Sequence, residues 1–170
     1  MTQRVWDSFL TEQDQAHLAL TGRKPVGFGE KPALLLVDLY RWVFGDDPEP
    51  LLEGIKTWPS SCGLAAWDAI PHIQTLLQAV RNAGIPVIHM TGLDGCGVEG
   101  WSTRKGDRRP VDTDPAAADR RSREYDIIDE VAPIDGEAFL RKSSPSSFWG
   151  TPLAGHLNYL GVDTIITVGE

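Results

Sequence analysis

The stretch Phe139-Leu-Arg-Lys-Ser-Ser-Pro-Ser-Ser-Phe-Trp-Gly-Thr-Pro-Leu153 joins a short apolar run to a loop of small residues and then to the start of a helix. The run predicts a strand over 137–141 that ends just before Lys142. Thr151 is a good N-cap, and Pro152 suits the first helical position because its missing N–H has no partner to lose there. A lysine between a strand end and a helix start lies where open α/β sheets place their ligand crevice. The stretch therefore predicts that Lys142 belongs to a site.

Asp38 is the expected carboxylate partner of this lysine. It follows Ala33–Val37, a continuous apolar run without alternation. Such a run is typical of a strand covered on both faces, as in a parallel sheet. Position alone leaves a second interpretation open with equal weight, namely an acidic residue that opens a turn.

The other apolar segments predict helices and strands in alternation: a helix over 68–83, a strand over 85–90, a helix over 151–160 and a strand over 164–168. Asp68 can cap the first of these helices, and Pro71 is tolerated in a first turn. Strand, helix and strand of these lengths form a right-handed βαβ unit. We therefore expect an α/β fold of the three-layer α/β/α (Rossmann-like) type, with a mainly parallel central sheet flanked by helices.

Two long connections, 39–63 and 91–125, have the length of binding loops or lids. The aromatic residues of the first either line a pocket or cover the edge of the core: Trp42, Phe44 and Trp58. The second carries two basic clusters, at 104–109 and at 120–123. Such clusters are usually solvated, but an arginine or lysine among them could clamp a substrate carboxylate.

Composition sets the class of protein. The chain has 170 residues, 41% of them hydrophobic, and a net charge of −8, which fits one globular domain. The acidic balance argues against a nucleic-acid surface and against binding to an anionic membrane. The N-terminus lacks the apolar core of a signal peptide. Two cysteines, Cys62 and Cys96, are too few for a disulfide framework and favour a reducing cytoplasm, and neither carries the signature of a nucleophile.

Two further residues bear on the expected crevice. His89 falls at the end of the strand over 85–90, where a neutral histidine hydrogen-bonded at the core edge is favoured over a catalytic one. The strand over 164–168 would emerge into the crevice just before Glu170, so we expect the chain to continue beyond that residue. No glycine-rich phosphate loop follows Val37, which makes a nucleotide enzyme an unfavourable interpretation.

Three segments together resemble the isochorismatase-like cysteine hydrolases, a family that includes nicotinamidases and N-carbamoylsarcosine amidases. Residues 27–38, Gly-Phe-Gly-Glu-Lys-Pro-Ala-Leu-Leu-Leu-Val-Asp, resemble the opening strand of the family with its catalytic aspartate. Arg141-Lys142 with Ser146-Ser-Phe-Trp-Gly-Thr-Pro-Leu153 resembles the catalytic-lysine motif. Residues 160–169 resemble the strand that leads to the nucleophile. The resemblance spans about residues 25–170 and is closer to the N-carbamoylsarcosine amidase branch.

The resemblance implies a cysteine-dependent amidohydrolase that cleaves a C–N bond of a small amide, carbamoyl or ureido compound through a thioester. Asp38 and Lys142 would be catalytic, and the nucleophilic cysteine would lie beyond Glu170. The candidate substrate-binding residues are Phe44, His89, Trp149 and Arg104. We expect residues 1–30 to form an N-terminal arm with a short helix over 11–20, and 31–170 to form the hydrolase domain. A cytoplasmic homo-oligomer (dimer or tetramer) without cofactor is expected.

Some positions depart from the family. Tyr40 and Val43 stand where the family often has a glutamine and an aromatic residue, and the metal-binding histidines of nicotinamidases have no counterpart, so we expect no metal. Two alternatives stay open: a non-catalytic binding or regulatory protein of this fold, and a hydrolase of a vinyl ether. The residue at the expected nucleophile position would separate them from the amidase.

Overall fold

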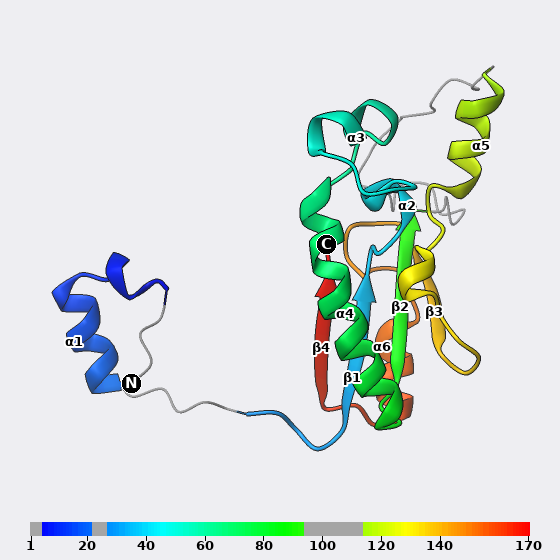
Figure 1. Cartoon of the computed structure of the whole chain (residues 1–170). Coiled ribbons are helices and arrows are strands. Elements are labelled where there is room, and N and C mark those ends of the chain that lie inside the picture. Colours follow the sequence, from blue (N-terminus) through cyan, green and yellow to red (C-terminus); the bar gives the residue numbers. More distant parts are fainter. Residues whose placement is uncertain (1–4, 22–26, 94–113) are drawn as a thin grey trace.

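The structure, a computed structural model, describes residues 5–21, 27–93 and 114–170. Four strands form one sheet in the order β3-β2-β1-β4, and each neighbouring pair is parallel (Figure 1). The strands are β1 Pro32–Val37, β2 Val87–Leu93, β3 Ala138–Lys142 and β4 Thr164–Gly169. The predicted parallel α/β fold is thereby confirmed.

Helices cover both faces of this sheet. The helical elements are η1 Asp7–Phe9, α1 Glu12–Thr21, α2 Arg41–Phe44, α3 Leu51–Thr57, α4 Leu64–Asn82, α5 Pro115–Arg123, η2 Asp129–Val131 and α6 Leu153–Leu160. Figure 1 shows α4 on one face and α6 on the other, whereas α2, α3 and α5 lie beyond the carboxyl ends of β1 and β2. Of the residues described, none forms a helix both long enough and apolar enough to cross a bilayer.

The alternation of side chains along β1 divides the core into two layers. Leu34 and Leu36 pack with residues of α4, and Ala33 and Leu35 pack with Leu153 and Leu157 of α6. All four β1 side chains are buried. A strand buried on both faces needs apolar residues at successive positions, which is why β1 reads as a continuous apolar run.

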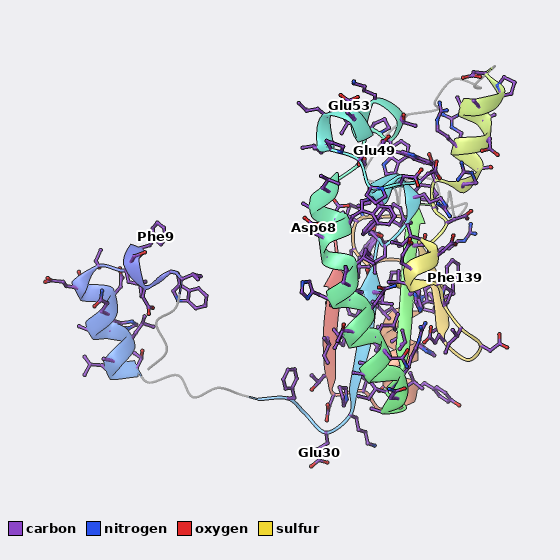
Figure 2. The ribbon with its side chains drawn as sticks, viewed as in Figure 1. Phe9, Glu30, Glu49, Glu53, Asp68 and Phe139 are labelled. Atoms are coloured by element: carbon purple, nitrogen blue, oxygen red, sulfur yellow. The ribbon has the colours of Figure 1, made fainter. Side chains whose placement is uncertain are left out.

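Helix α4 differs from its prediction at its start. It begins at Leu64, four residues before Asp68, which lies on the exposed side of the helix (Figure 2). Gly63 turns the chain into the helix with a φ of 61°, and a Cβ there would lie 2.7 Å from the backbone of Leu51. The indole N–H of Trp67 donates to the carbonyl of Phe44 at 2.8 Å, which fixes the first turn by a contact between distant residues.

The two long connections contain helices that periodicity did not predict. Helices α2 and α3 lie within 39–63, and α5 lies within 91–125. The two connections also bond to each other, since the backbone N–H of Trp42 donates to the carbonyl of Glu124. The backbone N–H of Arg41 donates to the carbonyl of Asp126, directly after the second connection. Short helices of this kind are held by such tertiary contacts rather than by their own propensity.

Candidate active site

An ion pair joins the carboxyl ends of two strands that are not neighbours in the sheet. Lys142 Nζ, at the end of β3, donates to Asp38 Oδ2 just after β1 at 2.6 Å. Strand β2 lies between them, so the long lysine side chain crosses its end, and Nζ also donates to the carbonyl of Pro145 at 3.1 Å. Both side chains are buried. The structure thus brings together the two residues that the sequence predicts as partners.

The backbone around Asp38 is unusual. Asp38 has a φ of 57°, and among the residues described it is the one residue other than glycine in the left-handed region. Aspartate tolerates this region better than most residues because its short polar side chain can bond locally. The N–H of Asp38 donates to Met90 O at 3.0 Å. This bond ties the turn after β1 to β2 and fixes the direction in which the carboxylate leaves the strand.

The carboxylate of Asp38 is only half satisfied. Oδ2 accepts from Lys142, whereas Oδ1 is buried and has no hydrogen-bond partner among the residues that the structure describes. Burial raises the pKa of Asp38 above its ordinary value, although the Lys142 ammonium acts in the opposite direction. A buried carboxylate with one open oxygen and a raised pKa is suited to accept and return a proton.

The loop between β3 and α6 supplies further polar groups near the lysine. Ser143 and Ser144 are buried, and Ser143 Oγ has no partner in the described parts of the chain. Thr151 Oγ1 accepts from the N–H of Leu153 at 3.2 Å, which is the bond of a capping residue, although the helix itself begins at Leu153. The sequence patterns did not identify Ser143 as a site residue. The one signal that could have done so is its position directly after Lys142.

Two of the other predicted site residues, Phe44 and Trp149, differ in their burial. Phe44 is in the core, where it packs edge-on against Trp67 of the first turn of α4 at a centroid distance of 5.6 Å. Trp149 is 60% exposed on the loop before α6. Arg104 and Cys96 lie outside the described residues.

His89 belongs to a second charged cluster. Its ring is fully buried, and Nε2 lies 2.8 Å from Glu137 Oε2. Arg81 of α4 holds the same carboxylate with two bonds of 2.7 and 2.9 Å. Glu137 directly precedes β3, so this cluster lies at the amino end of that strand, whereas Lys142 ends it. In this structure His89 is a buried, hydrogen-bonded histidine, which is the interpretation that the sequence favoured.

The protonation states of this second cluster follow from its hydrogen bonds and from its burial. Burial acts to raise the pKa of Glu137, but hydrogen bonds from Arg81, His89 and the N–H of Ile134 outweigh it and hold the pKa at about 2. Burial lowers the pKa of His89 against the opposing pull of Glu137. At neutral pH Glu137 is therefore ionised and His89 is neutral.

Cys62 lies near the carboxyl end of β4 but is not activated. Its Sγ lies 3.6 Å from Glu170 Oε1, and burial together with this carboxylate raises the pKa of the thiol. A protonated thiol is a poor nucleophile. In the described ranges, no three side chains of His, Cys, Asp or Glu gather as a potential metal site.

Comparison with known proteins agrees with the fold. Residues 32–169 match the isochorismatase domain. Maleamate amidohydrolase of Pseudomonas putida is 31% identical over 153 residues, which cover 85% of this chain and 61% of that protein. N-carbamoylsarcosine amidase of Arthrobacter sp is 28% identical over 158 residues, which cover 86% of this chain and 52% of that protein.

Solved structures show the same fold. The crystal structure of N-carbamoylsarcosine amidase from Thermoplasma acidophilum aligns with a TM-score of 0.56 at 23% identity, covering 82% of this chain and 68% of that one. The chain spans 52% and 61% of the length of the two curated relatives. Because the domain match covers nearly all of the sheet and its helices, the chain belongs to the isochorismatase family.

Proposed function

We propose that the protein is an amidohydrolase that cleaves a C–N bond of a small amide, carbamoyl or ureido compound. The observation that carries the proposal is the buried Asp38–Lys142 pair, with Asp38 Oδ1 open, at the carboxyl ends of the parallel strands. This edge is where open α/β sheets bind their ligands. The names of the two curated relatives, an amidase and an amidohydrolase, support the reaction class.

The proposed nucleophile is a cysteine that follows Glu170. In the sheet, Gly169 of β4 lies beside Val37 of β1, so residues after β4 would start next to Asp38. A Cβ on Gly169 would lie 1.8 Å from Val37 O, which shows how closely the two strand ends approach. A thiol at this place would be within reach of the open carboxylate oxygen. Cys62 is not proposed for this role because its thiol pKa is raised.

The steps follow from the charges of the pair. Asp38 takes the thiol proton, and the Lys142 ammonium stabilises the negative charge that this creates. The thiolate attacks the carbonyl carbon and forms a tetrahedral oxyanion. Asp38 then gives its proton to the leaving nitrogen as the C–N bond breaks, which leaves a thioester. Water, deprotonated by Asp38, hydrolyses the thioester and releases the acid with the free thiol.

The test measures ammonia or amine release from small amides, carbamoyl amino acids and ureido compounds by the full-length protein. Lys142→Met and Asp38→Asn should each lower kcat/KM by at least about a hundredfold, because general acid–base groups contribute in that range. Arg141→Met is the matched control, since it removes a neighbouring cation of β3 that is exposed. Circular dichroism checks the fold of each variant. Activity within a few-fold of the unmodified protein in either site variant would overturn the mechanism.

A further inference from the structure

A cavity of about 350 Å³ lies between α5 and the segments that follow β1. Neither Asp38 nor Lys142 contributes to its lining. Its walls are formed by Trp42, Thr57, Trp58, Pro59, Ala117, Arg120, Arg121 and Glu124. A volume of this order suits a small organic ligand.

One face of α5, continued by its C-cap residue, lines this cavity. Ala117, Arg120 and Arg121 of α5 and the C-cap Glu124 follow the i, i+3, i+4, i+7 spacing that places side chains on one side of a helix. The lining also contains Trp42 and Trp58, whose rings meet edge to face at a centroid distance of 6.5 Å. The cavity therefore combines two aromatic rings with two arginines in its lining.

Ion pairs and a backbone hydrogen bond join α5 to the segments that follow β1. Arg123 of α5 pairs with Asp46 at 2.7 Å, and Arg41 of α2 pairs with the same carboxylate at 3.2 Å. The N–H of Trp42 donates to Glu124 O at 2.9 Å. These contacts hold α5 against α2, so the cavity is formed before any ligand enters it.

Charge indicates the kind of ligand. Arg120 is half-buried and has neither a hydrogen-bond acceptor nor a carboxylate partner within residues 5–21, 27–93 and 114–170. Two arginines against the single carboxylate of Glu124 give the lining a formal surplus of one positive charge, in a chain whose net charge is −8. A planar guanidinium presents a fork of N–H donors that matches a carboxylate.

We propose that this cavity binds a small organic carboxylate with a flat apolar body. The carboxylate pairs with Arg120, and the body packs against Trp42 and Trp58. The site is separate from the Asp38–Lys142 pair, so the proposal holds whatever reaction that pair performs. It also gives a role to Arg120 in the basic cluster at 120–123.

The test uses benzoate as the probe, with binding to the full chain followed by tryptophan fluorescence and by calorimetry. Benzoate should bind saturably at one site per chain, and neutral benzamide of the same shape should bind at least about tenfold more weakly. Arg120→Gln should weaken benzoate binding by at least about tenfold. Lys31→Gln removes the same charge from an exposed lysine just before β1 and should change the affinity less than twofold.

Two further variants distinguish binding in this cavity from binding elsewhere on the protein. Ala117→Leu should block benzoate by filling the cavity without changing the charge. Asp38→Asn should leave benzoate binding unchanged even where it removes turnover. The proposal is overturned if benzoate does not bind at millimolar concentration, if Arg120→Gln behaves like Lys31→Gln, or if Asp38→Asn abolishes binding, which would place the ligand at the other site.

Discussion

The carboxylate side chains of Asp38 and Glu137 are only 13% and 8% exposed, and each lies beside a cation. They differ in how many of their oxygen atoms have partners. Both oxygens of Glu137 accept from Arg81, and Oε2 also meets His89 and the N–H of Ile134. Asp38 uses one oxygen for Lys142 and leaves the other without a partner in the described chain. The pKa moves accordingly, to about 2 for Glu137 and upward for Asp38.

The difference separates a structural tie from a reactive group. A carboxylate whose two oxygens both have partners stays ionised and fixes the elements around it, here α4 and the start of β3. A carboxylate with an open oxygen in a buried place lowers stability, and such arrangements are kept where chemistry needs them. Both clusters contain an acid and a base at hydrogen-bond distance, so distance alone does not distinguish them.

The largest expected effect comes from breaking the cluster of Glu137 with Arg81 and His89, in which both carboxylate oxygens have partners. Glu137→Gln leaves the Arg81 guanidinium without its counter-charge and should lower the free energy of unfolding by about 3 kcal/mol. Denaturant titration followed by circular dichroism measures it. Glu130→Gln is the matched control, because Glu130 is exposed, and it should change stability by less than about 0.5 kcal/mol. Equal stability of the two variants would remove the structural role assigned to Glu137.

Lowering the pH should reduce the stability that this same cluster contributes, over a defined range of pH. The pKa of Glu137 falls from 4.5 unfolded to about 2 folded, so its stabilisation is complete above pH 4.5 and is lost as the pH falls toward 2. The loss amounts to about 3 kcal/mol. His89, whose pKa is lowered by burial, acts in the same direction from about pH 6.5 downward. Asp38 acts oppositely, because its raised pKa favours the folded state at low pH.

Unfolding curves recorded from pH 6 to pH 2 test this linkage. Stability of the unmodified protein should fall steeply below pH 4.5, and Glu137→Gln should flatten that part of the curve. A curve of unchanged slope in the variant would assign the acid sensitivity to other groups.

The smallest expected effect is on the stability of a doubly substituted site. Asp38→Asn combined with Lys142→Met removes both charges and should leave the free energy of unfolding within about 1 kcal/mol, or raise it, because replacing a whole buried ion pair is often neutral. The single change Asp38→Asn should lower the free energy of unfolding more than the double change does, since the buried ammonium of Lys142 then loses its counter-charge. A loss above about 3 kcal/mol in the double variant would show that the pair is itself a structural tie.

The second cluster supplies the contrast for that experiment. Glu137→Leu combined with Arg81→Met removes its ion pair but leaves His89 and the N–H of Ile134 without their acceptor. This double variant should stay destabilised by about 2 kcal/mol or more. Recovery of stability here would erase the distinction between the two carboxylates.

The sheet and the Asp38–Lys142 contact could be predicted from the sequence because both depend on local signals. An unbroken apolar run marks β1, and the carboxyl ends of parallel strands gather at one edge, which brings the residues after them together. Asp38 stands directly after such a run, and Lys142 stands one residue after the shorter run Ala138-Phe-Leu140.

Other features depend on contacts between distant residues. The start of α4 at Leu64 depends on Gly63 against Leu51 and on Trp67 against Phe44, so a capping signal at Asp68 pointed to the wrong turn. The partner of His89 could not be read from its strand, because Glu137 reaches it from the next one. Sequence patterns report periodicity and caps but not which side chains meet across the fold.

The strand order has a consequence for how the chain is made. β1 lies inside the sheet, yet Leu34 pairs with Val87 and Ala33 pairs with Ile165, so its two neighbours are supplied far apart along the chain. The ribosome releases β1 first and β4 last among the four strands. Until β4 has been made, one row of backbone N–H and C=O groups of β1 has no strand beside it. This strand is apolar throughout. The nascent chain must therefore carry an open, aggregation-prone strand edge until β4 has been made.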